Sequence, residues 1–192
     1  MKEHLQTKDL ITTGIFTAIY FILFFAVGML GYIPIFFILL PFILPIISGI
    51  PFMLFLTKVK CFGMVSIMGM ILGILMTLTG HTYTPIISGV IFGILADLIL
   101  KLGAYKSKKI SIFGYGIFSM WLLGMLAPFW LMKDSFERIM KDSMGSEYTK
   151  IVFELFDKIF WYFPLMAFLG GIIGAFFGLK MLKKHFKRAG IA

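Results

Sequence analysis

Charged and polar side chains are scarce in this sequence of 192 residues. Only 14% of the residues are charged, asparagine is absent and glutamine occurs once. Soluble domains carry about 25% charged residues. The hydrophobic share is 60%, and a soluble domain of this size would leave much of it in water, because roughly 30% of the surface of the chain stays exposed after folding. The composition therefore excludes a soluble protein and predicts an integral membrane protein.

Residues that bind metals, form disulfides or carry out catalysis are also rare. The single cysteine, Cys61, excludes an internal disulfide and a cysteine cluster, and the three histidines are never close together in the sequence. The chain contains no P-loop, no G-x-S-x-G motif and no H-E-x-x-H motif. We therefore expect no metal site and no cofactor, and we expect that the chain is not an enzyme.

Six apolar runs approach the length needed to cross a bilayer core of about 30 Å, which takes roughly 20 helical residues. We expect a single all-α transmembrane domain over residues 1–192, built as a six-helix bundle with spans at about 10–29, 33–56, 62–78, 85–100, 110–132 and 160–182. No small-residue cleavage site follows the first run, so we expect it to remain as a span rather than to be removed as a signal.

Lysine and arginine alternate between the two sides of this predicted bundle. The two termini and the loops after the second and fourth spans carry 13 of these residues, whereas the opposite side carries five, all in the loop 133–159. The positive-inside rule then places both termini in the cytoplasm. It also accounts for the net charge of +9 without nucleic acid, and the basic cluster at 180–188 fits an anionic inner leaflet.

Prolines distinguish the second span from the others. Pro34, Pro41, Pro45 and Pro51 fall within twenty residues, and each interior proline removes a backbone hydrogen bond and clashes with the preceding turn. We expect this span to be kinked or broken. Such a segment either forms the wall of a cavity or serves as a kinked packing helix.

The long loop 133–159 has the pattern of amphipathic helices. Its second half places apolar residues at helical spacing, namely Tyr148, Ile151, Val152, Leu155, Phe156 and Ile159. A shorter helix is expected to begin near Asp134, with Glu137 three residues later as in a capping box. We predict two amphipathic helices on the outer face, acting either as a lid over a pocket or as interfacial anchors.

Small residues recur at four-residue spacing on several spans. The pairs and triplets are Gly14 and Ala18, Gly69 and Gly73, Gly89 and Gly93, and Gly170, Gly174 and Gly178. Such ridges let helices approach closely in lipid. Most are expected to pack inside the bundle, but the ridge near the start of the chain can equally face another protein.

Asp97 is the only acidic residue within a predicted span. It precedes Lys101 by four residues, the favourable order for an ion pair on one helix face. The simpler interpretation is an interfacial Asp97–Lys101 pair. The alternative is a proton or cation relay, which would need further ionisable partners inside the membrane.

Candidate ligand contacts lie at the outer ends of the spans. The turn 79–85 holds the densest run of hydrogen-bonding side chains in the membrane part, and several aromatic residues fall on the same side. An interfacial aromatic belt explains the aromatic residues without a ligand, but these groups would also suit a flat heterocyclic ligand. The predicted substrate-binding residues are Tyr32, Thr79, His81, Tyr83, Trp130, Trp161 and Tyr162.

With these features, the sequence resembles the S-components of energy-coupling factor (ECF) transporters. The resemblance rests on the chain length, the six spans, the cytoplasmic termini, the small-residue ridge on the first span and the structured outer loop. The segments 8–31 and 68–81 look like the Trep_Strep branch of that group. The resemblance extends over nearly the whole chain, although its individual motifs are short.

The resemblance implies a substrate-capture subunit of the cell membrane. S-components bind a micronutrient at the extracellular side and associate with a membrane T-component and two cytoplasmic ATPases. Gly14 and Ala18 match the A-x-x-x-A pattern that contacts the T-component, with glycine replacing the first alanine. The implied substrate is a vitamin, a vitamin precursor or a haem-like ring compound. The alternative function is a passive channel or a secondary carrier for a small solute.

Overall fold

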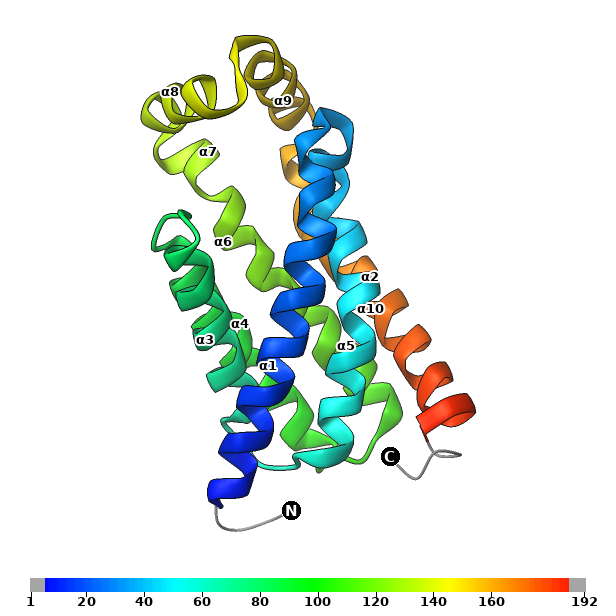
Figure 1. Ribbon diagram of the computed structural model, residues 1–192. Helices are drawn as coiled ribbons and strands as arrows, with labels where there is room; N and C mark the ends of the chain where they lie inside the picture. Colours follow the sequence, from blue (N-terminus) through cyan, green and yellow to red (C-terminus); the bar gives the residue numbers. More distant parts are fainter. Residues whose placement is uncertain (1–5, 187–192) are drawn as a thin grey trace.

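The chain is helical throughout the part that the structure describes. The computed structural model describes residues 6–186, the last two by their backbone alone. Lys2, Lys187 and Arg188, which contribute to the predicted topology, lie outside these residues. The main helices of the bundle (Figure 1) are α1 (Thr7–Gly28), α2 (Pro34–Lys58), α3 (Met64–Leu78), α4 (Thr84–Leu102), α5 (Lys108–Ser119) and α10 (Phe163–Met181).

Five stretches of the described chain are long and apolar enough to cross a membrane. They are Thr7–Tyr32, Pro34–Lys58, Thr84–Leu102, Lys108–Leu131 and Ser146–Lys184, and they correspond to five of the six predicted spans. The third predicted span is the apolar helix α3, which has only 15 residues and covers roughly 22 Å at the helical rise of about 1.5 Å per residue. Its principal neighbour is α4.

The lysine-rich segments lie together at one end of the bundle. Figure 1 shows the start of α1, the end of α10 and the turns that follow α2 and α4 at the bottom of the view. Two helices lie across the opposite end, α8 (Lys133–Met144) and α9 (Ser146–Ile159). The predicted grouping of the positive segments on one side is therefore present in the fold.

The prediction that the second span is broken is wrong. α2 runs without interruption from Pro34 to Lys58, although Pro41, Pro45 and Pro51 lie inside it. All three interior prolines are buried, and the α2 backbone around Phe42–Gly49 lies directly against glycines of α10. We infer that this close packing along the helix holds the proline-bearing turns in helical geometry.

The interrupted span is the fifth. After α5 the chain passes through a 3₁₀ turn (Met120–Leu122) and two four-residue helices, α6 (Leu123–Leu126) and α7 (Pro128–Leu131). Pro128 has no N–H and therefore cannot bond to the carbonyl of Gly124 four residues earlier. That carbonyl instead accepts a hydrogen bond of 2.6 Å from the Thr84 hydroxyl of α4. Ser88, one turn further along α4, donates to the Trp121 carbonyl at 2.7 Å, so α4 satisfies backbone groups that the interruption leaves free.

The prediction of two amphipathic helices in the long loop is confirmed by α8 and α9. Their apolar faces pack on the bundle around Phe129, whose ring centroid lies 4.4 Å from that of Phe156, 4.8 Å from that of Phe136 and 4.9 Å from that of Phe153. The capping box expected at Asp134 is not formed, because α8 begins one residue earlier, and Glu137 pairs with Lys141 at 2.7 Å.

Glycines set the closest helix contacts of the bundle. A Cβ added at Gly69 of α3 would lie 2.2 Å from the carbonyl oxygen of Gly89 of α4, and one added at Gly174 of α10 would lie 2.2 Å from that of Pro45 of α2. Real Cβ atoms do not approach backbone atoms so closely, so only glycine allows these crossings. The ridges on α3, α4 and α10 therefore pack within the bundle, as predicted.

Asp97 joins α3 to α4 rather than pairing with Lys101. It is fully buried, and its carboxylate accepts hydrogen bonds from the Ser66 amide at 2.8 Å, the Ser66 hydroxyl at 2.7 Å and the Tyr105 hydroxyl at 3.1 Å. Ser66 lies in the first turn of α3, whose N-cap Gly63 has no side chain, so Asp97 caps that helix from its neighbour. Lys101 instead lies over the ring of Phe62, with Nζ 5.3 Å from the ring centroid. The predicted ion pair is wrong.

Asp97→Ala is expected to lower the free energy of unfolding by about 1–3 kcal/mol, the cost of leaving buried donors without an acceptor. Asp97→Asn keeps an acceptor oxygen and is expected to lose less. Unfolding of the purified protein in detergent measures both effects. Lys101→Gln is the control, which removes only the contact with the Phe62 ring and is expected to lose less than Asp97→Ala, so an equal loss in Lys101→Gln and Asp97→Ala would contradict the capping role.

Candidate functional site

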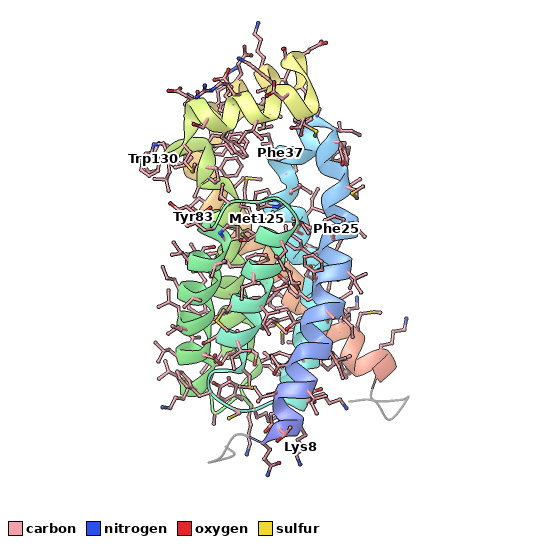
Figure 2. All side chains as sticks on the ribbon, turned by 60° about the vertical axis from the view of Figure 1, so that its left-hand side comes forward. Lys8, Phe25, Phe37, Tyr83, Met125 and Trp130 are labelled. Carbon is pink, nitrogen blue, oxygen red and sulfur yellow. The ribbon has the colours of Figure 1, made fainter. Side chains whose placement is uncertain are left out.

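A cavity lies beneath α8 and α9, between the ends of α1, α2, α3 and α6. Its volume is about 310 Å³, and we call it the upper cavity after its position in Figure 1. Figure 2 shows Phe25, Phe37 and Met125 of its wall gathered at this level of the bundle. The wall is mostly aromatic, aliphatic or methionine side chains, listed here in full: Phe24, Phe25, Gly28, Met29, Gly31, Tyr32, Phe37, Leu40, Leu44, Met76, Thr79, His81, Met125 and Met144.

The polar groups of the upper cavity come from two turns. Tyr32 lies in the turn between α1 and α2, whereas Thr79 and His81 lie in the turn between α3 and α4. The Thr79 hydroxyl lies 3.4 Å from Nδ1 of His81. Desolvation lowers the pKa of the His81 imidazole, and the uncharged form of the ring offers one donor and one acceptor. An apolar pocket with a few converging polar groups is the usual form of a small-molecule site.

The structure thus brings three of the seven predicted ligand residues, Tyr32, Thr79 and His81, to one cavity. The other four do not line it: Tyr83, Trp130, Trp161 and Tyr162. Exposure does not separate the two groups, since Tyr32 is itself 62% exposed. Trp161 is the most exposed of the four, at 83%, and Figure 2 shows Trp130 projecting from the edge of the bundle. Their positions agree with an interfacial aromatic belt, which was the alternative to ligand binding for these residues.

Helix α8 borders the upper cavity. Met144, the last residue of α8, lines it, and Phe136 of α8 lines a smaller hollow of about 90 Å³ that shares His81 and Met125 with it. The Tyr148 hydroxyl of α9 donates a hydrogen bond to the Gly31 carbonyl in the turn between α1 and α2. The two helices are therefore fastened to the bundle by the aromatic cluster around Phe129 at one side and by Tyr148 at the other.

A cluster of buried polar groups lies just below the floor of the upper cavity. The Tyr20 hydroxyl, the Ser48 hydroxyl and the Trp121 indole N–H are fully buried and lie close to one another, but none of them makes a hydrogen bond of normal geometry among the described residues. Phe24 separates them from the cavity, since it lines the cavity and its ring lies 5.2 Å from that of Trp121. Buried groups of this kind usually bond to ordered water or to a ligand.

A layer of aromatic rings fills the centre of the bundle below these groups. Phe52, Tyr115 and Phe118 are fully buried, and the ring of Phe52 lies 4.5 Å from that of Tyr115 and 4.9 Å from that of Phe118.

Sequence analysis did not identify the cavity residues Phe24, Phe37 and Met125. The only available signal was a general richness in phenylalanine and methionine, which does not distinguish a cavity wall from a core.

The ridge on α1 differs from the other small-residue ridges. Gly14 and Ala18 are both exposed, and a Cβ added at Gly14 would have no neighbour within 4 Å. Exposed isoleucines flank them, including Ile11, Ile15 and Ile22. This span is the least buried of the five candidate spans. This face of α1 is therefore free to contact lipid or another protein.

The comparisons with known proteins agree with the membrane architecture. Within residues 6–186, no three histidine, cysteine, aspartate or glutamate side chains converge as they would around a metal ion. Neither a curated protein nor a solved structure matches the chain. A family model described as "Hypothetical bacterial integral membrane protein (Trep_Strep)" matches residues 7–188. The chain is thus a bacterial multi-pass membrane protein that belongs to the Trep_Strep family.

Proposed function

We propose that this protein is the substrate-capture subunit of an ECF-type importer. In this role it binds a small micronutrient in the upper cavity from the extracellular side, then delivers it with a membrane T-component and two cytoplasmic ATPases. The proposed arrangement has six membrane spans, of which the one formed by α3 is the shortest, and both termini in the cytoplasm. The upper cavity is the observation that carries the proposal, because an apolar pocket with converging polar groups suits capture of a small molecule.

The size and lining of the upper cavity narrow the ligand class. Its volume of about 310 Å³ lies at the small end of the range of roughly 300–1,000 Å³ for ligand pockets. This favours a vitamin-sized ring compound over a haem-like ring, which would need α8 and α9 to move. Phe24, Phe25 and Phe37 offer faces for stacking, and Met76 and Met125 adapt to an irregular outline.

The packing of the bundle argues against the alternative of a passive channel. The upper cavity ends above Tyr20 and Trp121, and the aromatic layer of Phe52, Tyr115 and Phe118 fills the core beneath it. A channel needs a continuous polar path, and this core would have to open to provide one. The sequence also contains no nucleotide-binding P-loop, so ATP-driven uptake requires partner subunits that hydrolyse ATP.

The direct test is to identify the molecule that the protein carries. Mass spectrometry of small molecules extracted from the purified protein should find one ring compound at close to one equivalent. The protein alone in liposomes should bind that compound without transporting it, and uptake should require ATP and the partner subunits. Sustained flux through the protein alone would contradict the proposal and support the channel or carrier.

His81→Ala is expected to weaken the affinity for that compound at least tenfold, because it removes the main polar group of the cavity wall. Trp161→Ala is the matched control and is expected to change affinity less than twofold, since Trp161 lies outside the cavity. Isothermal titration with the purified variants measures both. Equal affinities of the wild type and His81→Ala would move the binding site away from the upper cavity.

A further inference from the structure

A second, larger hollow lies at the other end of the bundle, where both described chain ends are found. It lies between α2, α5 and α10 and has a volume of about 570 Å³. Five lysines line it: Lys60, Lys106, Lys108, Lys180 and Lys183. We call it the lysine pocket. It is separate from the upper cavity, with which it shares no residue.

The lysine pocket is a concentration of positive charge without a counter-charge. No carboxylate lines it, and none of its five lysines forms an ion pair within residues 6–186. Among the described residues, the only acidic ones at this end of the bundle are Asp9 and Asp97, and neither lines the lysine pocket. Ammonium groups held around one hollow repel one another, and a bound anion relieves that repulsion.

The other half of the lysine pocket is apolar. Met53 and Leu56 of α2 and Leu179 of α10 line it, together with Phe176, whose side chain is 58% exposed on the outer surface of α10. The neighbouring Phe113 of α5 and Phe177 of α10 are also exposed, so the surface beside the pocket is of the kind that faces lipid tails. A molecule that fills the pocket would therefore meet positive charge at one end and hydrocarbon at the other.

We propose that the lysine pocket binds the phosphate headgroup of an anionic membrane phospholipid, with the acyl chains lying along Phe176 and Leu179. The phosphodiester supplies the negative charge, and the Ser111 hydroxyl in the wall of the pocket adds a neutral donor. Basic pockets between membrane helices recognise anionic headgroups in this way. A free phosphate ion would satisfy the lysines but leave the apolar half uncovered. This site goes beyond the proposed function and does not depend on it.

Native mass spectrometry of the purified full-length protein tests the site. With phosphatidylglycerol and phosphatidylcholine of equal chain length, the wild type is expected to retain one phosphatidylglycerol at least about tenfold more tightly. A fourfold variant should lose that preference. It carries Lys106→Gln, Lys108→Gln, Lys180→Gln and Lys183→Gln.

A matched variant removes the same charge from the same end of the molecule but outside the pocket. It carries Lys8→Gln, Lys58→Gln, Lys101→Gln and Lys109→Gln, and it is expected to keep the preference within about twofold. An equal loss in both variants would overturn the proposal in favour of diffuse surface charge. Displacement of the lipid by millimolar inorganic phosphate would overturn it in favour of a small-anion site. No preference in any of the three proteins would also overturn it, and would leave the lysines as contacts for an acidic protein surface.

Discussion

Replacing Gly174 with leucine is expected to leave little folded protein. A Cβ at this position would lie 2.2 Å from the carbonyl oxygen of Pro45 and 2.9 Å from the Cα of Ile46, and these backbone atoms cannot rotate away as a side chain can. α10 would therefore have to separate from α2, its principal neighbour in the bundle. Overpacking a core typically costs about 1–3 kcal/mol, and a whole isobutyl group against backbone is expected to exceed that range.

The measurement is the yield of monodisperse protein and its melting temperature in detergent. Gly14→Leu is the control, since Gly14 belongs to a ridge of the same spacing but a Cβ there would meet nothing within 4 Å. We expect Gly14→Leu to behave as the wild type and Gly174→Ala to fall between Gly14→Leu and Gly174→Leu. Similar melting temperatures for Gly174→Leu and Gly14→Leu would show that the α2–α10 contact is not as close as described.

The contrast between these two glycines shows what helical spacing can and cannot predict. A four-residue repeat of small residues indicates that one face of a helix is smooth, and this holds for both α1 and α10. It does not indicate what that face contacts, because the neighbour is chosen by the packing of the whole bundle. The sequence therefore left the partner of Gly14 and Ala18 open, and only the fold shows that this face is uncovered.

The prolines show the same limit for local rules. Proline removes one hydrogen bond wherever it occurs, so the interior prolines of α2 predicted a kinked or broken helix, yet α2 is continuous. The fifth span is interrupted next to a single proline, Pro128, where Thr84 of α4 reaches the carbonyl that Pro128 leaves free. Whether a proline interrupts a helix thus depends on contacts with other helices, which the sequence does not display.

The polar residues of the candidate site could be predicted from their position at the outer ends of the spans. His81 and Thr79 drew attention because polar side chains are rare in this chain, and both line the upper cavity. The aromatic residues could not be sorted in the same way, because a tryptophan at a membrane interface has the same sequence context whether it points inward or outward. Asp97 was identified as unusual, but its partner Ser66 lies 31 residues away, beyond the reach of helical spacing.

Tryptophan at both Gly14 and Ala18 is expected to reduce uptake strongly while leaving ligand binding intact. Both residues are exposed on the least buried candidate span, so two indole rings can be accommodated at the lipid-facing surface without disturbing the bundle. On the proposed function, the same rings prevent α1 from approaching the T-component closely, because helices associate in lipid by close packing of small residues. Uptake into cells that express the partner subunits should fall at least about tenfold. This corresponds to a loss of roughly 1.4 kcal/mol or more in the free energy of association between this protein and the T-component.

The matched control places tryptophan at Leu165 and Leu169 of α10, which have the same four-residue spacing and are 52% and 43% exposed. This variant adds the same bulk to another lipid-facing surface, so it should keep both uptake and co-purification with the partner subunits. The Gly14→Trp and Ala18→Trp variant should bind the micronutrient with wild-type affinity, because the upper cavity begins at Phe24, nearly two turns beyond Ala18. Loss of binding and uptake together would indicate misfolding, whereas unchanged uptake would show that the exposed ridge of α1 contacts lipid alone and that the energising subunits dock elsewhere.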